Sequence, residues 1–398
     1  MTGAGRHLPL RRALAATMAA AGAMLVGATP AVAELAPPPV AAIDPKPADD
    51  WPRPTPDEVA ASHWVLVEGA TGQRLAEHRA DEQRAVASTI KVLTALTAIG
   101  RVDLDDEVTV GEEVLVGGAS VGLEPGETWS VQQLLEAILV RSGNDAAEAL
   151  ATHVAGTTED FLELMEADAQ ALGLPPRGFG SPSGLGDTNE LSAYELATIA
   201  RAALADDRLR PILAQEQTEL PGQGTVENRN ELLGSYPGAS GVKTGFTLAA
   251  GNSLVASAQR DGRELIAVVL DAGDDPARFA QAARLLDLGF SAFRAQELAL
   301  ELELSVAGGR RAFVLEPAPL TIPTDAVHEL VVDLPARVPE GPIAVAVEVD
   351  GTPVAMTQAE AVDHHASTTA ASAADLGAAL ADGAYATLRA AAAAGSLR

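Results

Sequence analysis

Cysteine is absent from this chain of 398 residues, and its absence excludes several kinds of site at once. Without a thiol there is no disulfide, no thiolate zinc site and no cysteine nucleophile. Histidine is scarce as well, and the seven histidines form no cluster with ligand spacing. His328-Glu329 lacks the second histidine that a zinc peptidase motif requires, so we expect neither a metal nor another cofactor.

Lysine is nearly absent too. Only three of the 27 basic residues are lysines, namely Lys46, Lys91 and Lys243, and the others are arginines. A guanidinium keeps its proton in a protein, whereas a buried amine can lose it. A lysine at 91, in a chain that otherwise uses arginine, therefore indicates a need for an amine that can act as a base.

Positive charge as a whole is short. The 27 basic residues face 55 acidic ones, which gives a formal net charge of −28 at pH 7. This excess of negative charge argues against nucleic acid or an anionic lipid surface as the main partner. We therefore expect no nucleic acid partner.

A long apolar run is also missing at the N-terminus. The run over 13–27 has about 15 residues, fewer than the ~20 that a spanning helix needs. It follows Arg11-Arg12 and precedes Ala31-Val32-Ala33, a pattern typical of a cleaved secretory signal. We predict a signal peptide over 1–33 and an exported protein on the envelope side of the cytoplasmic membrane. The arginine pair leaves Sec and twin-arginine export both open.

Composition divides the remainder into four segments. Residues 34–60 are rich in proline and alanine and are predicted to form an extended linker. Residues 61–297 mix helix and strand patterns, which predicts an α+β or α/β domain. Residues 298–360 alternate in short runs, which predicts a small β-rich module. Residues 361–398 form an alanine-rich tail, either a surface-seeking helix with weak membrane association or a solvated segment.

Two hairpins are predicted from their turns. Within the β-rich module, Ile343–Val349 and 352–357 flank Asp350-Gly351, a favoured two-residue turn. In the preceding domain, 254–258 and 265–270 flank Asp261-Gly262 in the same way.

The first candidate motif is Ser88-x-x-Lys91 at the start of a predicted helix. Positions three apart share a helix face, so the amine can reach the hydroxyl. The helix dipole there disfavours protonation of the lysine, and a neutral lysine can take the serine proton. The alternative is an N-cap serine with an exposed lysine.

The second motif is Ser142-Gly143-Asn144. It follows a predicted helix that begins with a capping box, Ser130 and Gln133, and it precedes an alanine-rich helix. The functional interpretation places Ser142 and Asn144 on a connection between two packed helices, pointing into a cleft. The alternative is that Asn144 merely caps the second helix.

The third motif is Lys243-Thr244-Gly245, on a strand leading into the hairpin around Asp261-Gly262. Gly245 would permit close backbone approach by a substrate. The alternative is the ordinary beginning of a strand.

In this order the three motifs resemble the signature of penicillin-recognising serine enzymes, which include D,D-peptidases and serine β-lactamases. The strings around them, with Ser183-Gly184-Leu185, are similar to low-molecular-mass D-alanyl-D-alanine carboxypeptidases, over about residues 61 to 290. The resemblance implies a β-lactamase/transpeptidase-like α+β fold. A helical subdomain would pack on a five-stranded antiparallel sheet, with the cleft between them and the small β module after them.

The resemblance also implies roles for the catalytic residues. Ser88 would attack the carbonyl between two terminal D-alanines, Lys91 would accept its proton, and Ser142 would pass a proton to the leaving amine. The N–H groups of Ser88 and Phe246 would form the oxyanion hole. The expected reaction removes the terminal D-alanine from peptidoglycan stem peptides, and β-lactams are expected to acylate Ser88.

Further residues would bind the substrate. Asn144 would hold the substrate backbone, Lys243 and Thr244 would bind the terminal carboxylate, and Arg229 resembles a further carboxylate contact. One departure stands out: the family usually has an aspartate on the first strand, where this chain has Glu68.

Several alternatives stay open. A D,D-endopeptidase uses the same apparatus. A serine β-lactamase of the commonest class needs Glu-x-x-x-Asn, which this sequence lacks. A nucleophile elbow fits Gly118-Ala-Ser120-Val-Gly122, but no predicted helix follows it. A non-catalytic envelope-binding protein would be expected to have lost Ser88 or Lys91.

Overall fold

The computed structural model describes residues 46–298 and seven later segments, 301–306, 309–315, 318–324, 329–334, 343–349, 352–362 and 387–392. The predicted signal peptide over 1–33 lies outside the described residues, and so does most of the alanine-rich tail. Among the helices that are described, none is both long and apolar enough to cross a membrane.

The centre of the peptidase-like part is an antiparallel sheet of five strands in the order β2-β1-β11-β10-β9. Its strands are β1 (His63–Glu68), β2 (Arg74–His78), β9 (Ala239–Thr247), β10 (Gly251–Arg260) and β11 (Arg263–Leu270). The β10–β11 turn is the predicted Asp261-Gly262, and both of its residues have positive φ, 51° and 80°. That conformation matches the twist of the flanking strands, and the predicted hairpin is confirmed.

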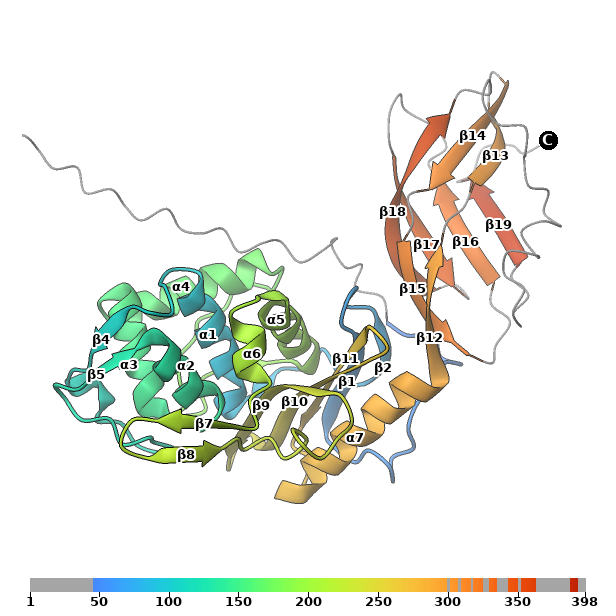
Figure 1. Cartoon of the computed structure of the whole chain (residues 1–398). Coiled ribbons are helices and arrows are strands. Elements are labelled where there is room, and N and C mark those ends of the chain that lie inside the picture. Colours follow the sequence, from blue (N-terminus) through green and yellow to red (C-terminus); the bar gives the residue numbers. More distant parts are fainter. Residues whose placement is uncertain are drawn as a thin grey trace, which may run out of the picture. The chain divides into compact units, whose positions relative to one another are not determined.

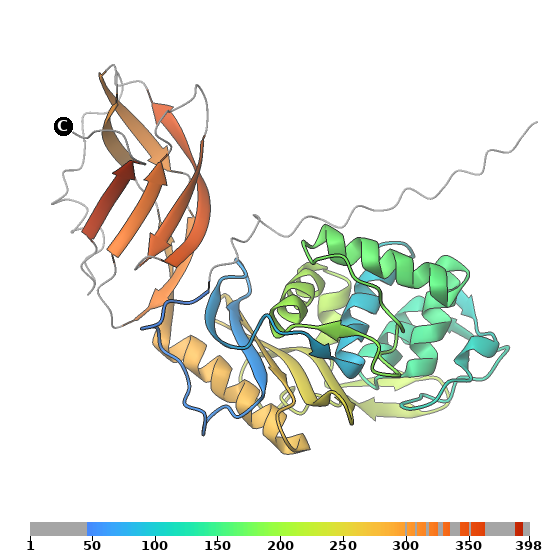
Figure 2. The same cartoon turned by 180° about the vertical axis from the view of Figure 1, so that it is seen from behind.

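Both faces of this sheet are buried, and alternate residues of each strand face opposite sides. In β11, Ile266 and Val268 belong to the core shared with the helical subdomain. Their neighbours Leu265 and Ala267 belong to a second core, formed with helix α7 (Asp275–Ala292). Both views place α7 on the side of the sheet opposite to the green and teal helices (Figures 1 and 2).

The helical subdomain contains η1 (Ala87–Ile90), α1 (Lys91–Ile99), η2 (Glu112–Val114), α2 (Val131–Leu139), α3 (Asn144–Ala155), α4 (Thr158–Ala171), α5 (Ala193–Ala205) and α6 (Leu209–Leu213). The predicted capping box of Ser130 and Gln133 starts α2. A second one, of Ser192 and Glu195, starts α5. Short pairs join the helices: β3 (Arg84–Ala85) with β6 (Glu190–Leu191), β4 (Glu107–Thr109) with β5 (Thr128–Ser130), and β7 (Gln217–Leu220) with β8 (Gly224–Glu227).

The predicted linker over 34–60 is not extended throughout. Trp51 and Val59 are buried in the core on the α7 side, and the Trp51 ring packs edge-on against Phe293 at 5.7 Å between centroids. The proline content of this segment indicated a linker, so the burial of Trp51 and Val59 was not predicted. The folded core therefore starts before the predicted boundary at residue 61.

The later strands form two sheets. One pairs β12 (Phe293–Leu298) with β15 (Ala318–Pro323). The other has the order β13-β14-β18-β17-β16-β19, made of β13 (Glu301–Val306), β14 (Gly309–Leu315), β16 (Glu329–Leu334), β17 (Ile343–Val349), β18 (Thr352–Val362) and β19 (Thr387–Ala392). Antiparallel pairing of β17 with β18 confirms the hairpin predicted from Ile343–Val349 and 352–357.

The tail differs from its prediction in one place. Thr387–Ala392, expected to be helical or solvated, pairs in parallel with β16 as strand β19. Composition did not predict this strand because its partner lies 58 residues earlier in the chain.

Candidate active site

The residues of the first motif lie where the sequence places them, at the start of the helical subdomain. Ser88 belongs to η1, which leads directly into α1, where Lys91 is the first residue. The Nζ atom of Lys91 lies 2.9 Å from Ser88 Oγ. Ser88 is half-buried, but Lys91 has no exposed surface. The alternative of an N-cap serine with an exposed lysine is therefore wrong.

Three oxygen atoms surround the Lys91 amine. Besides Ser88 Oγ, Nζ contacts Asn144 Oδ1 at 2.7 Å and the main-chain oxygen of Ser183 at 2.5 Å. The last two atoms can only accept hydrogen bonds. A neutral amine has two hydrogens and one lone pair. When the hydrogens bind Asn144 and Ser183, the lone pair faces the Ser88 hydroxyl, ready to accept its proton.

The surroundings also favour the neutral amine. Burial lowers the pKa of Lys91 from 10.5 to about 7, and the positive charge of Arg229 acts in the same direction. Glu148 and Asp145 raise the pKa and so oppose this effect. At pH 7 about half of the Lys91 amines are neutral, against roughly one in three thousand for an ordinary lysine.

The second motif lies on the connection between α2 and α3, as predicted. Ser142 is buried, has a positive φ of 67°, and lines the same cleft as Ser88. Asn144 begins α3 and uses both ends of its amide, because Oδ1 accepts from Lys91 and Nδ2 donates to the Gly117 carbonyl at 2.8 Å. Its contact with substrate stays a prediction, and the structure adds a role in holding Lys91.

The nucleophile-elbow alternative is wrong. Gly118–Gly122 forms a loop between η2 and β5 and not a strand-to-helix turn. The Ser120 hydroxyl donates to Asp145 at 2.5 Å, and the same carboxylate accepts from the N–H groups of Val121 and Leu123. Ser120 therefore helps to fix one wall of the cleft.

The third motif lies on β9, as predicted, and the surroundings of two of its residues differ from those expected. An added Cβ at Gly245 would lie 2.9 Å from the Val86 carbonyl oxygen and 3.0 Å from Thr89 Cγ2. The close approach that requires glycine is thus made by the chain around Ser88 itself. Strand β9 and helix η1 therefore pack closely at Gly245, which fixes the position of one relative to the other.

Lys243 is the second difference. It is fully buried, and its Nζ donates to the Thr244 carbonyl at 3.0 Å. Burial, together with the charges of Lys91 and Arg229, holds its pKa well below the ordinary value. Thr244 lines the cleft, whereas Lys243 lies beneath it. The predicted contact of Lys243 with a substrate carboxylate stays a prediction.

Guanidinium groups line the cleft. Arg229 was predicted, and its exposed side chain belongs to the cleft wall. Arg278, which the sequence did not indicate, reaches the cleft from the first turn of α7 and donates to the Gly245 carbonyl at 3.3 Å. Asp274 and Pro276 mark the start of this helix in the sequence, but nothing there shows that the helix meets the cleft.

The cleft has a volume of about 900 Å³, enough for a short peptide. Exposed apolar side chains, Leu185 and Phe246, form part of its wall. The lining residues are Ser88, Gly118, Ala119, Arg141, Ser142, Asn144, Gly184, Leu185, Arg229, Glu231, Thr244, Gly245, Phe246, Thr247, Asn252, Asp275 and Arg278.

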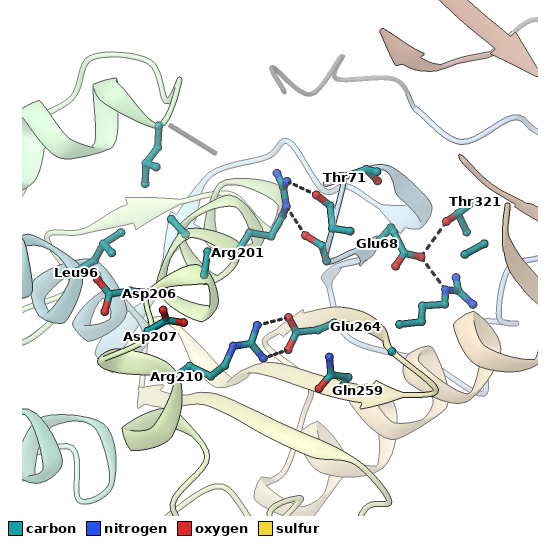
Figure 3. Close-up of a pocket in the computed structure, with 18 of the residues that line it drawn as sticks. Glu68, Thr71, Leu96, Arg201, Asp206, Asp207, Arg210, Gln259, Glu264 and Thr321 are labelled. Carbon is teal, nitrogen blue, oxygen red and sulfur yellow. Dashed lines mark hydrogen bonds and ion pairs between the residues drawn. The ribbon is translucent and has the colours of Figure 1, made fainter. Parts of the chain in front are cut away.

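A second cavity, of about 920 Å³, lies between the α5–α6 connection and the ends of strands β1, β10 and β11 (Figure 3). Several of its charged side chains pair with one another: Arg210 donates to both carboxylate oxygens of Glu264, and Arg263 donates to Glu68 at 2.8 Å. Arg201 donates to the main-chain oxygens of Gly69 and Ala70. No serine or lysine lines it. The reaction is therefore assigned to the cleft of Ser88.

Glu68, the departure from the family pattern, has a structural role here. Its carboxylate is buried and also accepts a hydrogen bond from the Thr321 hydroxyl at 2.9 Å (Figure 3). Gln73 bonds the main chain of the same threonine in both directions, at 2.6 and 3.0 Å. These bonds attach β15 to the first hairpin. Within the described part of the chain, no group of three or more histidines or acids is arranged to hold a metal ion.

Comparison with known proteins agrees with this site. The family model of D-alanyl-D-alanine carboxypeptidase matches residues 51–274, which include all three motifs. The carboxypeptidase DacB2 of Mycobacterium tuberculosis is 37% identical over 250 residues, covering 60% of this chain and 84% of that protein. DacF of Bacillus subtilis is 34% identical over 245 residues, covering 59% of this chain and 63% of the relative. The match thus spans less than two thirds of DacF.

Solved structures extend the comparison. Penicillin binding protein 5 from Haemophilus influenzae has a TM-score of 0.68 and 26% identity, and the match covers 78% of this chain and 99% of that chain. DacD from Francisella tularensis has a TM-score of 0.66 and 25% identity, with 79% and 96% covered. These shares are too large to fit within residues 1–274, so the similarity continues into the later strands. The chain therefore belongs to the D-alanyl-D-alanine carboxypeptidase family.

Proposed function

We propose that this protein is a serine D,D-carboxypeptidase that removes the terminal D-alanine from peptidoglycan stem peptides. The observation that carries the proposal is the fully buried Lys91 amine, whose two other partners leave its lone pair for the hydroxyl of Ser88. Family membership supports the assignment. The reaction needs a nucleophile, a base, a proton relay and a carboxylate site, and the cleft has a candidate for each.

In the acylation step, Ser88 Oγ attacks the carbonyl carbon between the two D-alanines. Its proton passes to Lys91 Nζ, and the carbonyl oxygen becomes an oxyanion. The N–H groups of Ser88 and Phe246 are the proposed donors to that oxyanion, each worth roughly 3–4 kcal/mol in the transition state. Phe246 follows Gly245, whose close contact with η1 sets the distance between the two donors.

In the second half of acylation, the C–N bond breaks and the leaving amine must gain a proton. Ser142, which lines the same cleft, donates its hydroxyl proton to that amine and receives the one held by Lys91. D-Alanine leaves with a neutral or protonated amine, and Ser88 carries the ester. Water then hydrolyses the ester, returning the proton to Ser88 and releasing the shortened peptide.

The terminal carboxylate of the substrate is assigned to the cationic wall of the cleft. Arg229 and Arg278 carry the positive charge, although Arg278 is ion-paired with Asp275, and Thr244 adds a hydroxyl. Lys243 lies beneath Thr244, and its contact with the carboxylate is part of the proposal as well. A guanidinium can bind a carboxylate through two parallel hydrogen bonds, which fixes its orientation as well as its position.

β-Lactams are proposed as covalent inhibitors, and the envelope side of the cytoplasmic membrane as the location of the protein. β-Lactams present a strained amide with a nearby carboxylate, so we propose that they acylate Ser88. The signal-like pattern over 1–33 supports export to the envelope side of the cytoplasmic membrane, where the enzyme would meet peptidoglycan. Roles in cell wall biogenesis and cell shape would follow from that activity.

The test uses the full chain and a peptide ending in D-Ala-D-Ala. Wild-type protein is expected to release free D-alanine and to gain the mass of a fluorescent penicillin on the peptide that contains Ser88. Ser88→Ala loses both, while the matched control Ser291→Ala, at an exposed site on α7, keeps both. Hydrolysis that survives in Ser88→Ala would contradict the nucleophile assignment.

Two other outcomes would identify the alternatives. A penicillin adduct without D-alanine release points to a D,D-endopeptidase acting on cross-links. Rapid penicillin turnover without a lasting adduct would identify a serine β-lactamase, and absence of both labelling and release would indicate a non-catalytic binding protein.

A further inference from the structure

A carboxylate that belongs to none of the three motifs lies behind the Lys91 amine. Glu148 follows Asn144 by one helical turn on α3, so both side chains share a face of that helix. Its Oε1 lies 3.5 Å from the Ser183 hydroxyl, and its Oε2 accepts from the Thr158 hydroxyl at 3.0 Å. Ser183 in turn holds Lys91 through its main-chain oxygen at 2.5 Å. One residue thus connects the acid to the base.

The hydrogen-bond directions around Ser183 are consistent with this connection. Its N–H donates to the Ser181 hydroxyl oxygen at 3.0 Å, and the two hydroxyl oxygens are 2.8 Å apart. When Ser181 donates to Ser183, the Ser183 hydrogen is left for Glu148. Both serines are buried, so neither hydroxyl has bulk water as an easy alternative partner.

We propose that Glu148 is a positioning residue for the transfer of the proton from Ser88 to Lys91, acting through Ser183. The inference rests on the proposed function. Glu148 orients the loop whose carbonyl binds one Lys91 hydrogen, and it supplies negative charge behind an amine that becomes positive during acylation. It touches neither the substrate nor the reacting atoms.

The charges around Lys91 show why this acid matters. Arg229 lowers the pKa of Lys91, whereas Glu148 and Asp145 raise it. Asp145 is already bound by the loop of Ser120.

Glu148 itself is affected by its surroundings. Burial and the neighbouring Glu159 of α4 raise its pKa, while Thr158, Ser183 and Lys91 lower it. When Glu148 loses its charge, the effect of Arg229 on the pKa of Lys91 is less compensated. The pKa of Lys91 then falls, and the amine becomes a weaker base.

The experiment measures the second-order rate of acylation by a fluorescent penicillin between pH 5 and pH 9. For the wild type, the rate is expected to rise with pH through a midpoint near the Lys91 pKa of about 7. In Glu148→Gln the midpoint shifts to lower pH by ~0.5–1 unit, and the plateau falls about three- to tenfold because the base is weaker. Glu148→Asp keeps the charge and restores the wild-type midpoint.

The matched control is Glu163→Gln, the same chemical change at an exposed position of α4. It is expected to leave both midpoint and plateau at wild-type values. A Glu148→Gln midpoint equal to that of the wild type would overturn the inference, whether or not the melting temperature falls. If Glu148→Gln does not fold, a Glu148→Asp midpoint that moves as far as ~0.5 unit overturns it instead. Failure of the wild type to be acylated at all refutes the proposed function, and this outcome is visible before any variant is compared.

Discussion

Replacing Lys91 with methionine tests whether the base is held neutral by the fold. Methionine fills a similar volume but carries no charge and no titratable group. In the folded protein the pKa of Lys91 is about 7, while in the unfolded chain it returns to the ordinary value of 10.5. Between these two pH values the unfolded chain binds one more proton than the folded protein. The free energy of unfolding of the wild type therefore rises with pH across this window.

The size of the effect follows from the separation of the two pKa values. Each pH unit is worth about 1.4 kcal/mol where only the unfolded state holds the proton. Because Lys91 is still half protonated at pH 7, the gain between pH 7 and pH 9 is about 2 kcal/mol. The methionine variant lacks this gain. It also leaves Asn144 Oδ1 and the Ser183 carbonyl without a donor, at a cost of ~1–3 kcal/mol each that does not depend on pH.

The assay is urea unfolding of wild type and Lys91→Met at pH 7, 8 and 9, with the two free energies subtracted at each pH. Titrating groups distant from Lys91 are present in both proteins and cancel, whereas Lys243 does not cancel fully because Lys91 lowers its pKa. The difference is expected to change by about 2 kcal/mol in favour of the wild type from pH 7 to pH 9. A difference that stays constant would show that Lys91 titrates near its ordinary value, and the neutral-base mechanism would then fail.

Two further variants test the cleft. Arg229→Gln is expected to lower kcat/KM about 10–100-fold on a peptide with a free terminal carboxylate, since a hydrogen bond to a charged group is worth ~1.5–3 kcal/mol, and to have little effect on the corresponding amide. Because Arg229 lowers the pKa of Lys91, the same variant should move the acylation midpoint to higher pH, the opposite direction from Glu148→Gln; an unmoved midpoint would contradict this. Gly245→Ala introduces a Cβ 2.9 Å from the Val86 carbonyl, so η1 must shift, and we expect penicillin acylation to slow at least about tenfold and the melting temperature to fall. Gly178→Ala, with open space around its Cβ, is the control, and equal effects in the two variants would refute the packing argument.

Local patterns predicted much of this structure. Helical spacing and the Ser130–Gln133 capping box located α1 and α2, and Asp261-Gly262 located the central hairpin. These features depend on interactions within a few residues, which a sequence displays directly. The order of the three motifs then indicated the family, and with it the five-stranded sheet.

Other features could not be predicted because they depend on contacts between distant segments. Trp51 lies in a proline-rich stretch, yet it packs against Phe293. The burial of Lys243 beneath Thr244 and the entry of Arg278 into the cleft are set by how β9 and α7 pack, not by spacing. The close contact of Gly245 with the chain around Ser88 was not predicted either, because Val86 and Thr89 lie far from it in the sequence.

The sequence by itself determined which groups are available for chemistry. With no cysteine and three lysines, it restricted the nucleophile to a hydroxyl and pointed to Lys91 as the base. Only the tertiary structure decided that this lysine is a usable base at neutral pH. Its pKa depends on complete burial, on two acceptors from α3 and the Ser183 loop, and on the charges of Arg229 and Glu148. Electrostatic interactions act through space, so a pKa is set by groups that folding brings together from distant parts of the chain.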